Sequence, residues 1–283
     1  MTLRVLATGP LTTFQDAGRP GQAASGIGRS GACDRAAYAL ANQLVGNPAG
    51  TAVLEVTFGG LRLLAQQDAV LATTGARCAG AFPHQSPTAL PVGEQLRLGP
   101  PVTGLRTYVA VRGGFDIEPV LGSRSTDVLG GLGPAAVGIG DELSVGEAPP
   151  SAPGGEPAAE PVGGELQVDV LPGPRRDWFT DEAWVELIAS PYTVSMQSNR
   201  VGLRLEGPRL DRIRTNELPS EPMVRGAIQV PPSGQPVLFL ADHPVTGGYP
   251  VLAYVVDEHV DRCGQLRPGQ TLRFSPARGR LHG

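Results

Sequence analysis

Residues 147–165 read EAPPSAPGGEPAAEPVGGE, and this stretch separates the two halves of the 283-residue chain. It consists mainly of Pro, Gly, Ala and Glu and has no apolar periodicity, a composition typical of a linker or flexible loop. It divides the chain almost in half. We therefore expect two domains, residues 1–146 and 166–283, joined by a linker over residues 147–165.

Both halves have the pattern of short strands between tight turns. The chain contains 39 Gly and 28 Pro, well above their usual share, and Gly or Pro bounds most of the apolar runs. In the first half we predict strands at residues 3–8, 52–58, 69–76, 94–98 and 106–112. In the second half we predict strands at residues 166–171, 192–197, 202–206, 227–230, 237–241, 251–256 and 271–274.

One helix is expected in each half. Residues 34–45 carry an apolar stripe, with Asp34 suited to the N-terminal cap, and Gly46-Asn47-Pro48 ends the pattern. A second helix is predicted near residues 180–189, with Thr180 as a possible N-cap. Because closure removes exposed strand edges, we expect a mainly β fold of two barrel domains with about one short helix each.

The composition excludes several classes of function. The chain has 23 basic and 27 acidic residues, a formal net charge of −4, and every basic residue is Arg. The dispersed Arg residues argue against a nucleic-acid partner. The absence of Lys excludes a Schiff-base lysine, a phosphate-binding loop with its lysine, and a self-biotinylated lysine.

Membrane-spanning segments, disulfide bonds and metal sites are also not expected. The sequence has no run of 18 apolar residues, and its N-terminus lacks the apolar core of a signal peptide. We therefore predict a cytoplasmic protein without a membrane partner. Cys33, Cys78 and Cys263 form no C-x-x-C pair, which argues against a disulfide framework and against a zinc site.

Loops rich in Gly together with polar residues are the candidate site segments, because strands commonly display functional side chains on such turns. The first comprises residues 12–21 and 28–35. There Arg19 or Arg35 could pair with a carboxylate or phosphate through the planar guanidinium. The alternative is that Asp16 and Asp34 only cap turns and the helix. The further candidates in these loops are Gln15 and Ser30.

The second segment is residues 121–126, which lies between two Gly-Gly pairs. Backbone amides beside Gly, together with Arg124, Ser125 and Thr126, could form an anion-binding cradle. The alternative is that Ser and Thr only cap turns, which they do often.

Three further segments lie in the second half, at residues 198–202, 229–234 and 241–250. In the last, Gly247 and Gly248 would let the backbone approach a ligand closely. A plain tight turn between strands is the alternative. The candidate residues of these segments are Arg200, Gln229, Asp242, Thr246, Gly247, Gly248 and Tyr249.

Taken in order, these and neighbouring motifs resemble one known family. The motifs are TTFQDAGRPG, SGACDRAAYALANQLVGNP, AVLEVTFGG, YVAVRGGF, LGSRST, GDEL, SNRVGLRLEGP, GAIQVPPSGQP and ADHPVTGGYP. They resemble the family of the 5-oxoprolinase C subunit, also called allophanate hydrolase subunit 2 or KipI antagonist and described broadly as biotin-dependent carboxyltransferase. The resemblance runs nearly end to end and implies two cyclophilin-like β-barrel domains.

This sequence departs from the commoner family pattern in three places. Cys33 stands where Met is usual, Gly28-Arg29 where two prolines are usual, and Asn199 where Asp is usual. The change at Asn199 removes a carboxylate, which matters if that position holds a cation or acts as a base.

The resemblance implies a component of an ATP-dependent 5-oxoprolinase, in which the A, B and C subunits convert 5-oxoproline, ATP and water to glutamate, ADP and phosphate. The KipI-like B subunit would be the most direct partner, and ATP the cofactor, bound in the complex. Arg19 and Arg124 would stabilise developing negative charge, and Asp16 or Asp242 would position water. The catalytic candidates are therefore Asp16, Arg19 and Asp242.

Two alternatives remain open. The first is carboxyl transfer from carboxybiotin to a urea-like nitrogen, as in urea carboxylase and allophanate hydrolase systems; it requires biotin on a partner, because this chain has no lysine. The second is a regulatory partner that binds a KipI-like kinase inhibitor and relieves the inhibition.

Overall fold

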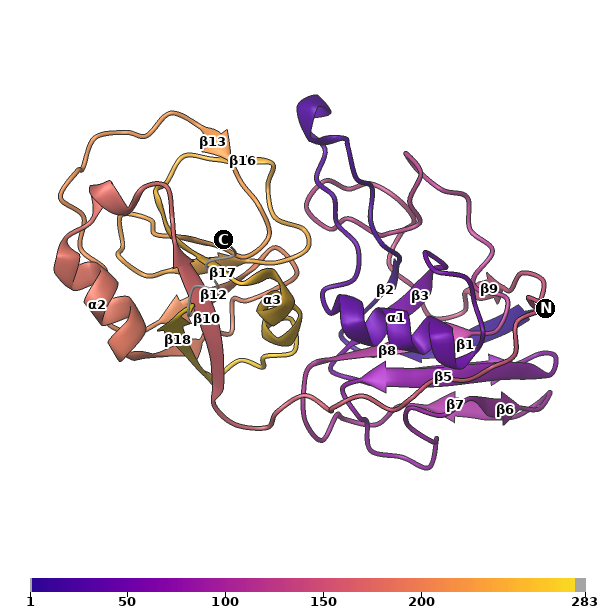
Figure 1. The fold of residues 1–283 in the computed structure, drawn as a ribbon. Helices are drawn as coiled ribbons and strands as arrows, with labels where there is room; N and C mark the ends of the chain where they lie inside the picture. The colour runs from indigo at the N-terminus through magenta and orange to yellow at the C-terminus, as the bar shows by residue number, and fades with distance from the viewer. Residues whose placement is uncertain (1, 278–283) are drawn as a thin grey trace, which may run out of the picture. The chain divides into compact units, whose positions relative to one another are not determined.

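The β-rich pattern of the sequence folds into two compact units in the computed structural model, which describes residues 2–277 (Figure 1). The first unit comprises residues 2–21 and 29–163, and the second comprises residues 22–28 and 164–277. Strands predominate in both, so the prediction of a mainly β protein is confirmed. Residues 278–283 of the predicted second domain lie outside the described residues.

The first unit contains two antiparallel sheets. The four-stranded sheet has the order β7-β4-β1-β9 and the five-stranded sheet the order β2-β3-β8-β5-β6. The strands are β1 (Thr2–Thr8), β2 (Leu11–Gln15), β3 (Val53–Thr57), β4 (Leu61–Ala65), β5 (Ala69–Gly75), β6 (Thr88–Leu90), β7 (Gln95–Arg97), β8 (Arg106–Val111) and β9 (Glu142–Ser144).

The strand ladders of the first unit thus form two sheets, whereas those of the second unit close into one barrel. The chain passes repeatedly from one sheet to the other, and two of these changes are tight corners that contain glycine, between β1 and β2 at Gly9-Pro10 and between β3 and β4 at Gly59-Gly60. Gly9 has φ 67°, and a Cβ atom there would lie 1.9 Å from the Gly59 carbonyl oxygen. Pro10 has no N–H to continue a ladder. The hydrogen bonds therefore run within two separate sheets.

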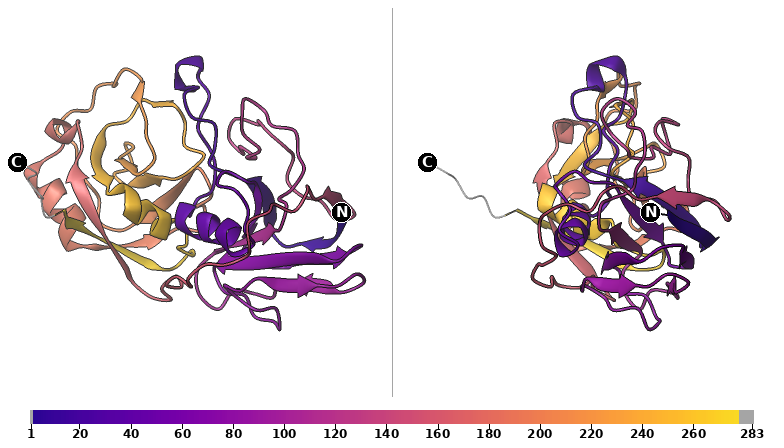
Figure 2. Two further views of the ribbon diagram at one scale, coloured as in Figure 1. Left: turned by 45° about the vertical axis from the view of Figure 1, so that its right-hand side comes forward. Right: turned by 90° about the vertical axis from the view of Figure 1, so that its right-hand side faces the viewer.

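Helix α1 (Arg35–Leu44) covers the five-stranded sheet, where it packs against β3, β5 and β8 (Figure 2). The Asp34 carboxylate accepts a hydrogen bond from the Ala37 amide at 3.0 Å, as expected for the N-cap. The buried face of the helix includes Ala41 and Leu44, which pack in a cluster with Tyr108 of β8. The predicted helix is confirmed within a residue at each end.

The second unit is a closed barrel with the strand order β10-β17-β14-β15-β12-β11-β18. Its β10–β18 pairing is parallel, and the other barrel pairings are antiparallel. The strands are β10 (Leu166–Pro172), β11 (Pro191–Val194), β12 (Gly202–Glu206), β14 (Ala227–Gln229), β15 (Val237–Phe239), β17 (Val251–Val255) and β18 (Thr271–Pro276). A separate two-stranded sheet pairs β13 (Glu221–Pro222) with β16 (Thr246–Gly247).

Two α-helices belong to the second unit. Thr180 caps α2 (Asp181–Ala189) by accepting from the Ala183 amide at 3.0 Å, as predicted. The third helix, α3 (Asp257–Cys263), was not expected. It is short and has no side-chain cap, so the sequence lacks the usual start signal, and burial of Val260 and Cys263 in the barrel core stabilises it instead. Short 3₁₀ turns are η1 (Ala23–Ser25) and η2 (Arg176–Trp178).

The segment that follows β9 is hydrogen-bonded along the first unit. Arg112 Nη2 donates to the Pro149 carbonyl oxygen at 2.6 Å, and the Gly154 amide donates to the Leu44 carbonyl oxygen at 3.1 Å. Further along, Gln85 and Arg77 contact residues 158 and 160. Within residues 2–277 no helix is both long and apolar enough to cross a membrane.

Candidate functional site

Asp16 follows β2 and joins two of the predicted site loops of the first unit. Its Oδ1 accepts hydrogen bonds from the Gly18 amide at 2.7 Å and from the Ser123 and Ser125 hydroxyls at 2.6 Å each. Its Oδ2 accepts from the Arg124 amide at 2.6 Å. The loop at residues 16–21 and the loop at residues 121–126 are thus tied together through one buried carboxylate.

Arg19 is the most buried cation of this arrangement, with 1% of its surface exposed. Its Nη2 donates to the Ser125 carbonyl oxygen at 2.6 Å, and its Nη1 lies 3.9 Å from Asp127 Oδ2. Nε and Nη1 have no hydrogen-bond partner among the described residues. Because unpaired buried donors are costly, this guanidinium is suited to bind an acceptor group supplied from outside the chain.

Other predicted residues gather around the same backbone segment. Gln15 Nε2 donates to the Thr126 carbonyl oxygen and to the Thr13 hydroxyl, at 3.0 Å each. The Ser30 hydroxyl donates to the same Thr126 carbonyl at 3.4 Å. Within residues 2–277, the buried Gln15 Oε1 and Thr126 Oγ1 atoms have no hydrogen-bond partner. The structure therefore brings Gln15, Ser30, Ser125 and Thr126 together near Asp16 and Arg19.

Three further predicted residues of the first unit are placed as follows. The Arg124 Nε atom donates to the Ile117 carbonyl oxygen at 2.6 Å. Asp34 caps α1, the alternative that the sequence left open, and its amide donates to the Tyr108 hydroxyl at 2.7 Å. Arg35 is the first residue of α1.

Sequence reasoning did not identify a buried polar network around Glu55 in the first unit. Glu55 Oε2 accepts from the Tyr108 hydroxyl at 2.8 Å and from the Cys33 amide at 2.9 Å, and Glu55 Oε1 lies 3.3 Å from Arg106 Nε. Burial, and secondly the negative charge of Glu55, raise the pKa of Tyr108 well above its ordinary value. Tyr108 therefore acts as a neutral hydrogen-bond donor. The available signal was a single Glu within the apolar run at residues 52–58.

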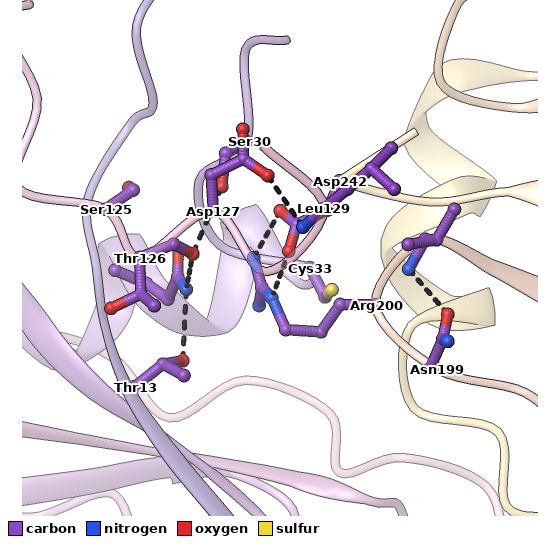
Figure 3. Close-up of polar contacts among 12 residues, drawn as sticks. Thr13, Ser30, Cys33, Ser125, Thr126, Asp127, Leu129, Asn199, Arg200 and Asp242 are labelled. Carbon is purple, nitrogen blue, oxygen red and sulfur yellow. Dashed lines mark hydrogen bonds and ion pairs between the residues drawn. The ribbon is translucent and has the colours of Figure 1, made fainter. Parts of the chain in front are cut away.

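In the second unit, Arg200 and Asp242 form a two-point ion pair. Arg200 Nε donates to Asp242 Oδ2 at 2.9 Å, and Nη2 donates to Oδ1 at 3.0 Å (Figure 3). Both residues are buried, with 1% and 2% of their surfaces exposed. Two predicted loops, at residues 198–202 and 241–250, are therefore joined by a charge-assisted contact of strong geometry.

Gln229 holds the glycine-rich turn of the same unit. Its Nε2 donates to the Tyr249 carbonyl oxygen at 2.9 Å. A Cβ atom on Gly247 would lie 2.7 Å from Gln229 Nε2, so a larger residue at this position would displace the Gln229 amide group. Thr246 and Gly247 form β16, which pairs with β13. Gly248 follows directly, and the Tyr249 side chain is exposed.

Asn199, one of the three departures from the commoner family pattern, stabilises the turn that it begins. Its Oδ1 accepts from the Val201 amide at 2.9 Å and from the Gly202 amide at 3.4 Å. A carboxylate oxygen could accept the same two bonds, so the change from Asp preserves the turn and removes one negative charge.

The cysteines and the other side chains that could bind a metal are dispersed in the described part of the chain. Cys33, Cys78 and Cys263 are free thiols. Among residues 2–277, no group of three or more His, Cys, Asp and Glu side chains is arranged to hold a metal ion.

Similarity to known proteins identifies the class to which the chain belongs. Residues 25–276 match the family model described as carboxyltransferase domain, subdomain A and B, and the chain belongs to this family. It is 36% identical to the C subunit of 5-oxoprolinase from Escherichia coli (strain K12) over 280 residues, which covers 96% of this chain and 90% of that protein. It is 32% identical to the 5-oxoprolinase C subunit of Haemophilus influenzae, covering 93% and 87% respectively.

The chain also resembles modules of larger proteins. It is 32% identical to urea amidolyase of Lachancea kluyveri, of which it covers 17%. The solved structure of Kluyveromyces lactis urea carboxylase superposes with a TM-score of 0.92 at 29% identity, over 97% of this chain and 27% of that one. The family resemblance inferred from the sequence motifs is confirmed. The relatives include 5-oxoprolinase C subunits as well as urea amidolyase and urea carboxylase.

Proposed function

We propose that this chain is the C subunit of a multi-subunit ATP-dependent 5-oxoprolinase, which converts 5-oxo-L-proline, ATP and water to L-glutamate, ADP and phosphate. The observation that carries the proposal is the 36% identity to the C subunit of the Escherichia coli 5-oxoprolinase over nearly the full length of both chains. The urea amidolyase and urea carboxylase relatives contain this module as a small part of a longer chain.

The reaction requires activation of a poor electrophile. A lactam carbonyl reacts slowly with water, and transfer of a phosphoryl group from ATP to its oxygen makes the carbon open to attack. Water then adds to that carbon, the ring C–N bond breaks to release the amine, and phosphate leaves when the resulting acyl phosphate is hydrolysed. These steps develop negative charge, which buried cations and amide donors stabilise. Arg19, with two buried donors that have no hydrogen-bond partner within residues 2–277, is our candidate for binding a phosphate or carboxylate oxygen.

The two candidate carboxylates are better suited to positioning than to acting as bases. Asp16 already accepts four hydrogen bonds, and Asp242 is paired at both oxygens with Arg200. We propose that Asp16 sets the conformation of the Ser123–Thr126 loop, and that the Arg200–Asp242 pair sets that of the turn at residues 241–250.

The A and B subunits complete the proposed enzyme, with ATP bound in the assembled complex and the KipI-like B subunit as the direct partner. Catalysis by the isolated chain is not expected. The three free thiols suit a reducing compartment such as the cytoplasm, which is where we place the complex.

A second candidate function is carboxyl transfer within a biotin-dependent urea carboxylase system. The observation that favours it is the TM-score of 0.92 to Kluyveromyces lactis urea carboxylase. Because the chain has no lysine, the biotin would be carried by a partner.

The test is reconstitution. Glutamate and ADP are measured from 5-oxoproline and ATP with this chain alone, with the A and B subunits alone, and with all three combined. Turnover only in the combined sample supports the proposal. A folded complex that is inactive on 5-oxoproline but carboxylates urea in the presence of a biotinylated partner would favour carboxyl transfer. A stable complex without any turnover would favour the regulatory alternative.

The role of Arg19 is tested in the same assay with Arg19→Lys, which keeps the charge but loses the forked donor geometry. We expect kcat/KM to fall at least about tenfold, the loss of one charge-assisted hydrogen bond. Arg4→Lys, at an exposed position of β1, is the matched control. Equal activity of both variants would remove Arg19 from the site.

A further inference from the structure

A cavity of about 540 Å³ lies in the first unit and shares no residue with the proposed site. One wall is formed by the chain after β5, and the other by residues of the segment 157–160. The lining residues used below are Arg77, His84, Gln85, Ala158 and Glu160. Both polar and apolar groups line the cavity, as in sites for peptides and small ligands.

The side chain of Gln85 recognises the backbone of Ala158. Gln85 Nε2 donates to the Ala158 carbonyl oxygen at 3.0 Å, and Gln85 Oε1 accepts from the Ala158 amide at 2.6 Å. These reciprocal bonds imitate the pairing of a neighbouring β-strand. Gln85 itself has φ 53°, an uncommon conformation for a residue other than glycine. The residue whose side chain binds the Ala158 backbone thus has a strained backbone conformation of its own.

Arg77 recognises a carboxylate two residues farther along the same segment. Its Nε lies 3.1 Å from Glu160 Oε2, and the two side chains are 51% and 39% exposed. Exposed ion pairs contribute little to stability, so this pair does not hold the segment firmly in place. It does favour an acidic residue at this position. Residues 157–160, Pro-Ala-Ala-Glu, are therefore bound as a short acidic peptide would be.

His84 leaves a ring nitrogen without a partner in the cavity wall. Thr73 Oγ1 lies 3.2 Å from His84 Nδ1 and 3.3 Å from the Pro83 carbonyl oxygen. His84 Nε2 is buried with no hydrogen-bond partner among the described residues. Burial lowers the pKa of His84, although nearby Glu160 opposes this, so the ring is neutral.

We propose that this cavity is a binding site for an extended acidic segment of a partner polypeptide, and that residues 157–160 occupy its mouth within the chain. Gln85 binds the backbone of one residue, and Arg77 binds the carboxylate two positions later. Ala158 lines the cavity with only a methyl group, which leaves the volume unfilled. A partner residue with a larger polar side chain at that position fills the cavity and hydrogen-bonds to His84 Nε2.

The probe is a fluorescein-labelled peptide amide, Pro-Trp-Ala-Glu, whose indole supplies both volume and an N–H. Its binding to the full chain is measured by fluorescence anisotropy. Because the tethered segment competes, Glu160→Gln should bind the probe about threefold to fivefold more tightly than the unaltered chain, the value of one exposed ion pair. Glu156→Gln, in the same exposed segment, is the matched control and should leave the affinity unchanged.

Specificity is tested in the Glu160→Gln chain. Adding Gln85→Asn, a residue that tolerates positive φ but is one methylene shorter, should weaken binding at least about tenfold. The Pro-Ala-Ala-Glu and Pro-Trp-Ala-Gln peptides should both bind more weakly than the probe. The proposal is overturned if the folded Glu160→Gln chain does not bind the probe, if Gln85→Asn has no effect, or if all three peptides bind equally.

Discussion

Asp16 and Ser125, which are 109 residues apart in the sequence, exchange two hydrogen bonds in the first unit. The Ser125 hydroxyl donates to Asp16 Oδ1 at 2.6 Å and accepts from the Asp16 amide at 3.0 Å. This reciprocal contact joins the end of β2 to the loop at residues 121–126, and it places the Ser125 carbonyl oxygen where Arg19 donates to it. The conformation of Arg19 thus depends on Asp16 through Ser125.

Asp16→Asn should destabilise this arrangement. The amide group cannot accept from the Arg124 amide and from both hydroxyls at once, so one charge-assisted bond to a buried group is lost. We expect the free energy of unfolding of the first unit to fall by about 2–3 kcal/mol, measured by urea denaturation followed by circular dichroism. Glu118→Gln, at an exposed position, should change it by less than about 0.5 kcal/mol. Equal stability of the two variants would contradict this role for Asp16.

Arg200→Ala should destabilise the second unit strongly, because it leaves the Asp242 carboxylate buried without its cation. The expected loss is about 3–5 kcal/mol. Trp178 and Trp184 are the only tryptophans of the chain and both lie in this unit, so urea unfolding followed by tryptophan fluorescence reports on it. Arg209→Ala, which removes an exposed side chain 3.9 Å from Asp211, should cost less than about 1 kcal/mol. A loss of similar size in both would refute a special contribution of the buried pair.

The three thiols should react at very different rates. Burial raises the pKa of Cys263 to about 12, and Cys33 is also fully buried, whereas Cys78 is partly exposed beside the cavity of the first unit. Since the thiolate is the reactive form, a disulfide reagent at pH 8 should modify Cys78 first in the native chain. Cys78→Ser should abolish the fast phase. A fast phase that persists in this variant would show that a buried thiol is accessible.

The stability of the first unit should decrease as the pH falls below 6.5. Burial lowers the pKa of His84 in the folded chain, whereas the unfolded chain keeps the ordinary value near 6.5. Between the two values the unfolded state binds more protons, so acidification favours unfolding. His84→Gln should flatten the slope of unfolding free energy against pH in the range just below 6.5. An unchanged slope would mean that His84 does not contribute.

Much of the fold follows from local patterns, and the exceptions have identifiable causes. Most predicted strands and both predicted helices are confirmed, since alternating burial and helix caps leave a clear signal. Strand β2 falls in a segment that is predicted as a loop, because Thr12, Thr13 and Gln15 are polar. They are buried nevertheless, with partners such as the Thr8 carbonyl oxygen for the Thr12 hydroxyl. The two sheets of the first unit depend on glycine corners, whose effect on strand pairing is not local.

The candidate site was predictable as a set of loops and not as a geometry. Density of Gly and polar residues led to Asp16, Arg19, Ser125, Arg200 and Asp242, which are buried and bonded in the structure. Which of them contact one another depends on pairings more than 40 residues apart. The Glu55–Arg106 contact was missed because both residues lie within apolar strands and belong to no glycine-rich loop.

The most direct test of the proposed function follows the lactam oxygen in the reconstituted complex of this chain with the A and B subunits. With 5-oxoproline labelled with ¹⁸O at the lactam carbonyl, phosphorylation of that oxygen by ATP releases ADP, and addition of water with cleavage of the ring C–N bond gives an acyl phosphate. Hydrolysis of the acyl phosphate at its C–O bond then gives glutamate and transfers the label to phosphate. Mass spectrometry should find ¹⁸O in the released phosphate, with one glutamate formed per ADP, and only when this chain is present. Unlabelled phosphate without glutamate, or label transfer that does not require this chain, would contradict the account.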